Sequence, residues 1–129
     1  MKQGVFQNGF RKLIVWKESH QLTLMVYTIT AQFPAEEKFG LVSQLRRASS
    51  SVGAQLAEGS RMHSGKHRRI YYERAYASLS EVDNFLELAL DLHFISEEKY
   101  EELLGQLNRT SALLNHLIAS CNVGQKLPS

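Results

Sequence analysis

Hydrophobic positions recur along this chain with the period of an α-helix, and turn-forming residues interrupt them at three places. Pro34 follows the first periodic segment, Gly59-Ser60 closes the second, and Ser64-Gly65 opens the third. Ser96 has the chemistry of an N-cap, and the acidic Glu97 and Glu98 follow it where the helix dipole favours negative charge. The pattern predicts four helices, over about residues 12–33, 41–59, 65–93 and 97–121.

No segment combines the alternation of a β-strand with suitable turn residues. The connections between the predicted helices are short, so that consecutive helices should be antiparallel neighbours. We therefore expect an all-α fold, an up-down-up-down antiparallel four-helix bundle over residues 10–121. Residues 1–9 and 122–129 are predicted to be flexible ends.

The second predicted helix has one narrow apolar stripe, which is typical of a helix that faces a core. The stripe consists of Leu41, Leu45, Ala48, Val52 and Leu56. The middle of this helix is rich in Ala, Ser and Gly, so a neighbouring backbone can come close. We expect this helix to be tightly packed.

The first predicted helix carries two apolar stripes, separated by roughly 150° at about 100° per residue. One stripe contains Leu13, Trp16, His20, Leu24, Tyr27 and Ala31, and the other contains Leu22, Val26, Ile29 and Phe33. One bundle core cannot bury both, so we assign the second stripe to an interface in a homo-oligomer. The alternative is a wide core-facing arc in a single chain.

Length and composition indicate an ordinary globular domain: 129 residues, 43% hydrophobic and 22% charged. The N-terminus lacks the pattern of a secretory signal, and no apolar run approaches the roughly 18 residues that cross a bilayer. Cys121 is the single cysteine, which favours a reducing compartment. We expect a cytoplasmic protein that does not enter a membrane.

The charges are unevenly distributed, although the net charge is only +2. Residues 46–74 contain seven Lys and Arg against two Glu, whereas residues 81–102 contain eight acidic residues and one Lys. Such polarity can steer an anionic partner to one end of a molecule or dock one subunit on another.

The basic residues crowd the predicted turn between the second and third helices, where exposed cations can neutralise phosphates. Tyr72 and Tyr76 share a helix face with Arg69, as a surface that stacks on bases requires. The predicted nucleic-acid site comprises Arg61, Lys66, Arg68, Arg69, Tyr72 and Tyr76.

A structural role competes with this interpretation. In an antiparallel hairpin centred near Met62-His63, Arg46 and Arg47 lie level with Glu81, and Glu58 lies level with Arg68 and Arg69. We assign Arg46, Arg47, Glu58 and Glu81 to interhelix ion pairs.

Candidates for catalysis and metal binding are weak. The chain lacks the Glu-x-x-His pairs of di-iron bundles, and Gly65 separates His63 from His67, so we predict no metal, no cofactor and no catalytic site. Helical ribonucleases of the HEPN type use Arg-x(4–6)-His. Arg61 with His67 and Arg109 with His116 fit that spacing, but matches of this kind also arise by chance.

Five segments in order carry a family resemblance that spans about residues 10–121. They are Leu13-Ile14-Val15-Trp16, Phe33-Pro34 with Glu36 and Glu37, residues 40–48, Leu56-Ala57-Glu58-Gly59 and residues 75–81. The chain resembles the four-helix bundle proteins encoded in intervening sequences of bacterial 23S ribosomal RNA genes. It departs from that family in having Gln55 where Asn is usual.

The resemblance implies a ring-like homo-oligomer, typically a pentamer. It also implies kinship with the accessory variability determinant of diversity-generating retroelements, which binds nucleic acid and a reverse transcriptase. We therefore expect a non-enzymatic oligomer that binds structured RNA or DNA. The alternatives are a protein-interaction scaffold without nucleic acid and, third, a HEPN-like ribonuclease.

Overall fold

A computed structural model of the chain describes residues 9–123, and side chains up to Cys121. In this range the chain is entirely helical, with no β-strand. The helices are α1 (Ile14–Thr30), α2 (Leu41–Ser60), α3 (Gly65–Asp91) and α4 (Glu97–Val123). Two short 3-10 helices, η1 (Phe10–Lys12) and η2 (Ala35–Glu37), precede α1 and α2.

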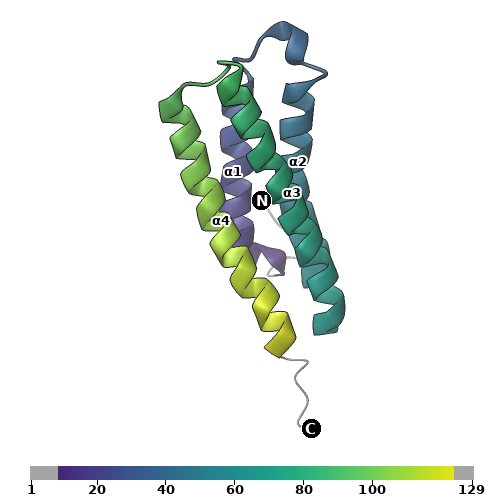
Figure 1. Cartoon of the computed structure of the whole chain (residues 1–129). Coiled ribbons are helices and arrows are strands. Elements are labelled where there is room, and N and C mark those ends of the chain that lie inside the picture. The colour runs from purple at the N-terminus through teal and green to yellow at the C-terminus, as the bar shows by residue number, and fades with distance from the viewer. Residues whose placement is uncertain (1–8, 124–129) are drawn as a thin grey trace.

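Consecutive long helices run in opposite directions, and α4 returns to lie beside α1 (Figure 1). The α1–α2 and α3–α4 connections lie at one end of the bundle, and the α2–α3 turn lies at the other. The predicted flexible ends fall mostly outside the described residues, while α4 extends two residues beyond the predicted helix end. No described helix has the length and apolar character needed to cross a membrane.

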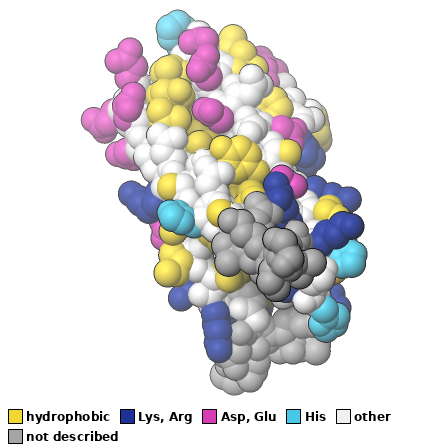
Figure 2. Space-filling view, turned by 60° about the horizontal axis from the view of Figure 1, so that its bottom comes forward, with side chains coloured by type: hydrophobic (Ala, Val, Ile, Leu, Met, Phe, Trp, Pro, Cys, Tyr) yellow, Lys and Arg dark blue, Asp and Glu magenta, His cyan; other side chains and the backbone are white. Residues whose placement is uncertain are grey.

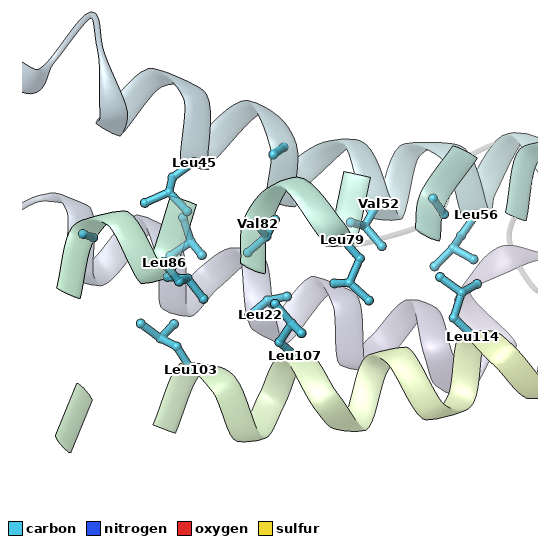
Figure 3. Packing of buried hydrophobic residues seen from close by; sticks show 14 of the residues in the cluster. Leu22, Leu45, Val52, Leu56, Leu79, Val82, Leu86, Leu103, Leu107 and Leu114 are labelled. Carbon is cyan, nitrogen blue, oxygen red and sulfur yellow. The ribbon is translucent and has the colours of Figure 1, made fainter. Parts of the chain in front are cut away.

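Leucine and valine side chains from all four helices point toward the common axis (Figure 3). The predicted stripe of α2 is buried along its whole length, because Leu41, Leu45, Ala48, Val52 and Leu56 are all at most 6% exposed. Burial of such side chains removes about 25 cal/mol of unfavourable hydration per Å² of apolar surface, so this core is the main source of stability.

The small residues of α2 permit close contacts on two sides, as predicted. Toward α1, the Thr23 hydroxyl donates to the backbone carbonyl of Ser49 at 3.0 Å. Toward α3, the Ser78 and Ser51 hydroxyls are 2.9 Å apart. Gly59 is buried beside Tyr72 near the end of α2. The glycine that we interpreted as a breaker is thus a packing residue inside the last turn of the helix.

The stripe of α1 that we assigned to a subunit interface faces the core of its own chain. Leu22 and Val26 are fully buried, Phe33 is 7% exposed, and Ile29 packs against the same cluster. The assignment is wrong because α2 and α4 flank α1 and cover this side of it. The apolar side chains that remain exposed on α1 include Leu24 and Tyr27 of the other stripe, together with Ile14.

Candidate nucleic-acid interface

The cations of the α2–α3 turn and the acidic residues of late α3 and early α4 lie toward opposite ends of the bundle. Arg46 and Arg47 of the basic stretch lie away from the turn, where they contact Thr30 and Glu81. The cations of the α2–α3 turn lie at one end, which we call the basic end and define by Arg61, Lys66, Arg68 and Arg69. The acidic residues of late α3 and early α4 lie toward the other, which we call the acidic end. Most Lys and Arg side chains in Figure 2 lie in its lower half, and most Asp and Glu in its upper half.

Local hydrogen bonds hold the turn at the basic end in one conformation. The backbone N–H of Met62 donates to the Gly59 carbonyl at 3.0 Å, which continues α2 into a tight turn. Ser64 is the N-cap of α3, because its hydroxyl accepts from the backbone N–H of His67 at 3.1 Å. The cap sets the direction in which Lys66 and His67 leave the helix, and both are exposed.

The four predicted cations come together at this end, but in different environments. Arg61 and Lys66 are exposed, whereas Arg68 and Arg69 are partly buried. Nη1 of Arg68 donates to the carbonyl oxygens of Met62 and His63 at 3.1 and 3.2 Å, so this guanidinium stabilises the turn. Nε of Arg69 lies 3.5 Å from Oε1 of Glu73, one helical turn along.

Two further cations were missed by the sequence analysis. Arg11 and Lys12 form the last turn of η1, which contacts α2 and lies at the end of α1 nearer to the basic end (Figure 1). They are remote in sequence from the cluster, so a count of charge along the chain does not group them with it.

The predicted stacking face of Arg69, Tyr72 and Tyr76 does not form. Tyr72 is 2% exposed, and its ring lies against Gly59 of α2. The prediction of a surface role for Tyr72 is wrong because the glycine leaves a space on α2 that the ring fills. Burial of the phenol, with a smaller contribution from Cys121, raises the pKa of Tyr72, while Arg68 nearby acts to lower it.

Tyr76 remains exposed, but it does not face the turn. It lines a shallow hollow of about 240 Å³ between α3 and α4, together with Asp83, Asn108 and Ser111. A carboxylate beside the ring repels phosphate. We therefore leave Tyr76 out of the phosphate-contacting surface.

One of the predicted interhelix ion pairs is present. Nη2 of Arg47 lies 2.7 Å from Oε2 of Glu81. Arg46 instead donates from Nε to the Thr30 hydroxyl at 2.9 Å, and its guanidinium lies 4.5 Å from the centre of the Tyr27 ring. The pairing of Arg46 with Glu81 is therefore wrong, since Arg46 faces α1.

The pairing predicted for Glu58 is also wrong. The contact of Ser51 with Ser78 places the centre of the α2–α3 hairpin near Ser64-Gly65 rather than Met62-His63. This shift moves Arg68 and Arg69 away from the level of Glu58 and onto the turn carbonyls and Glu73.

Comparison with known proteins identifies the family. The model of the 23S rRNA-intervening sequence protein family matches residues 11–116. The chain belongs to this family. A solved structure of a protein of unknown function from the S23 ribosomal protein family of Bacteroides thetaiotaomicron superposes with a TM-score of 0.76 at 22% identity, covering 82% of this chain and 96% of that one. No curated protein matches the chain.

The two ribonuclease-like pairs of this 23S rRNA-intervening sequence protein have other contacts. Nη1 of Arg109 lies 2.6 Å from Oε1 of Gln106 and 3.5 Å from Oε1 of Glu18, within a polar contact between α4 and α1. His116 lies two turns further on, about 10 Å along the helix axis. The His67 ring lies 2.8 Å from the Ser64 hydroxyl at the cap of α3. Neither pair lines the hollow between α3 and α4 or the one between α1 and α4.

The part of the chain that the structure describes contains no cluster of side chains suited to binding a metal ion. No group of three or more His, Cys, Asp or Glu side chains there is arranged to hold an ion. Cys121 is buried, and its Sγ donates to the Leu117 carbonyl at 3.5 Å. It behaves as a small core residue.

Proposed function

We propose that this 23S rRNA-intervening sequence protein is a non-enzymatic, ring-forming protein that binds structured RNA or DNA through its basic end. The observation that carries the proposal is the gathering of cations around one turn, at the end of the bundle opposite the acidic residues. Phosphate contacts of this kind supply affinity without reading sequence. Because local hydrogen bonds already fix the turn, its backbone need not be ordered when the cations bind.

A ring, such as the pentamer that the family resemblance implies, would repeat this end around its axis. Several weak sites on one rigid assembly bind one long polyanion far more tightly than a single site does. A nucleic acid held in this way offers a platform for a protein that acts on it, such as a reverse transcriptase. This part of the proposal rests on the resemblance.

The test uses Arg61 and Lys66, the two exposed cations of the basic end. We expect the double variant Arg61→Ala/Lys66→Ala to bind a labelled RNA hairpin or DNA duplex at least tenfold more weakly at low salt, measured by fluorescence anisotropy. The matched control is Arg47→Gln/Arg109→Gln, which removes two exposed cations that lie outside both the basic end and the groove between α1 and α4. Circular dichroism confirms that both variants are folded.

Three outcomes decide the proposal. Selective weakening in the Arg61/Lys66 variant supports it. Equal weakening in both variants would mean that only net charge matters, and unchanged binding would mean that the basic end is not used. Either result overturns the proposal.

A second candidate is a protein-interaction scaffold that binds no nucleic acid. It is favoured by the apolar side chains left exposed along α1, where Ile14 is 64%, Leu24 50% and Tyr27 45% exposed. Binding of a purified protein partner that survives nuclease treatment and the Arg61/Lys66 double substitution would select this function instead.

A further inference from the structure

The turn between η2 and α2 presents an aromatic side chain to solvent. Phe39 is 88% exposed, the highest value among the large hydrophobic side chains of the described residues. The turn is held from both sides: the backbone N–H of Gly40 donates to the Glu37 carbonyl at 3.0 Å, and that of Leu41 donates to Oε1 of Glu37 at 3.1 Å. The backbone of the turn thus holds Phe39 at the surface, where this apolar knob contributes nothing to its own core.

A hollow with a mixed apolar and polar lining lies at the same end of the bundle. It is a groove of about 440 Å³ between α1 and the start of α4. Its apolar lining consists of Leu24, Met25, Ile29, Phe94, Ile95 and Leu103. The walls come from α1, from the α3–α4 connection with Phe94 and Ile95, and from the first turns of α4. The flexible Met25 can adapt to the shape of an occupant. A groove of this size readily accommodates one aromatic side chain.

Lys38 beside the knob is opposite in charge to the acidic rim of the groove. Of the two acidic residues before Lys38, Glu37 turns its carboxylate back onto the N–H of Leu41, while Glu36 is exposed. Lys38 precedes Phe39, and its ammonium lies 5.4 Å from the centre of the Phe39 ring. The rim of the groove belongs to the acidic first turns of α4, where Glu102 lines the hollow and Glu98 and Glu101 are exposed nearby. Lys99 lines the same groove and its Nζ lies 3.4 Å from Oε2 of Glu102, so Lys38 of a second copy would share this carboxylate with Lys99.

We propose that the groove between α1 and α4 binds Phe39 of a second copy of this chain, with Lys38 of that copy directed toward Glu102. The inference rests on the self-association in the proposed function and specifies which surfaces form the contact between subunits. Knob and groove are different surfaces, so each chain carries one of each and the contact is heterologous, the type that closes into a ring when the rotation allows. The contact lies at the end opposite the α2–α3 turn, which leaves the basic end open to nucleic acid.

The experiment changes the knob and the groove separately in the full chain. Phe39→Ser removes the knob, and Leu24→Lys places a charge on the groove wall at a side chain that is half exposed, so neither change empties the core. Ile70→Ser is the control, because it removes an exposed apolar side chain near the basic end. Sedimentation velocity over a micromolar concentration range gives the size of each species, and circular dichroism shows that each variant is folded.

We expect the wild-type chain and Ile70→Ser to assemble to the same size, and each of the other two variants to associate at least tenfold more weakly. A mixture of Phe39→Ser and Leu24→Lys retains one intact knob and one intact groove. It should form a two-chain species that neither variant forms alone, and that species is the result specific to this contact.

Two results overturn the inference, and they differ in what else they overturn. A wild-type chain that stays monomeric throughout the range rules out self-association as well. A wild-type chain that assembles equally well with Phe39→Ser keeps the proposed ring, but shows that another surface or another occupant serves it. Nucleic-acid binding at the basic end is measured separately and can stand in either case.

Discussion

Gly59 and Gly105 both lie inside long helices, but the space around them differs. A Cβ atom at Gly59 would lie 2.7 Å from Cε1 of Tyr72 and 2.9 Å from Cβ of Tyr71, so the α2–α3 contact depends on the missing side chain. A Cβ atom at Gly105 of α4 would meet nothing within 4 Å, and the residue is exposed. The first glycine therefore serves packing, and the second only weakens its helix.

We expect the substitution of each glycine by alanine to change stability in opposite directions. Gly59→Ala should lower the free energy of unfolding by about 1–3 kcal/mol, because overpacking outweighs the gain in helix propensity. Gly105→Ala should raise it by about 1 kcal/mol. Urea denaturation followed by circular dichroism measures both, and a stabilised Gly59→Ala protein would contradict the close approach of α2 and α3.

Burial of Tyr72 should make the free energy of unfolding decrease at alkaline pH. Its pKa is raised by burial above the ordinary value of 10.0, so the folded state holds the proton more tightly than the unfolded state. The contribution of this group is complete below pH 10 and disappears as the pH rises through the folded pKa. Denaturation between pH 8 and pH 11 should show a smaller decrease in stability in Tyr72→Phe than in the wild type. Equal decreases would mean that Tyr72 does not titrate differently in the two states.

At the scale of the elements, short-range chemistry determines where the helices begin and end. Ser96 accepts from the backbone N–H of Lys99 at 3.1 Å, and Ser64 does the same for His67. At the end of α3, His93 has a positive φ of 64°, and the N–H of Phe94 returns to the Ala89 carbonyl at 2.9 Å. This is the Schellman arrangement, with histidine where glycine is usual. The caps orient α4 toward α1 and thereby build one wall of the groove between α1 and α4.

We expect Ser96→Ala to destabilise the protein by about 1 kcal/mol, since the first turn of α4 then has no side-chain cap. Ser80→Ala is the control, because the Ser80 hydroxyl is exposed and donates only to the Tyr76 carbonyl one turn back. It should be neutral or slightly stabilising. Thermal unfolding of the two variants distinguishes the roles, and equal melting temperatures would contradict the cap.

At the scale of the whole molecule, the order of the helices converts a charge pattern along the sequence into an electric asymmetry in space. The basic stretch spans the α2–α3 hairpin, and the acidic stretch spans the α3–α4 hairpin. Antiparallel packing puts the two hairpin turns at opposite ends. A polyanion is therefore attracted to one end and repelled from the other, which orients it before any specific contact forms.

This asymmetry predicts a strong dependence of nucleic-acid binding on salt. The logarithm of the binding constant should fall linearly with the logarithm of the salt concentration. Arg61→Ala/Lys66→Ala should reduce the slope by about 2 for each chain that binds the nucleic acid, because each substitution leaves one phosphate without its cation. Anisotropy titrations at several salt concentrations measure the slope. An unchanged slope would show that these side chains touch no phosphate.

Local sequence was enough to predict the number of helices, their ends to within a few residues, the core stripe of α2 and the cap at Ser96. It was also enough to predict the family, through segments spread over most of the chain. These features could be predicted because caps and helical periodicity depend on residues only a few positions apart. They are therefore readable from the sequence without knowledge of the tertiary packing.

Packing of the four helices was needed to decide which side of α1 faces the core, because both stripes are apolar and the choice depends on how α2 and α4 flank it. The same packing decided that Tyr72 fills the space at Gly59 and that Arg68 holds the turn. Both contacts depend on which residues of α2 and α3 lie level, and helical periodicity does not specify the centre of the hairpin that sets this. The exposed Phe39 and the groove between α1 and α4 are likewise features that only the packed structure reveals. A surface is what remains when the helices have packed, and no stretch of sequence contains that information by itself.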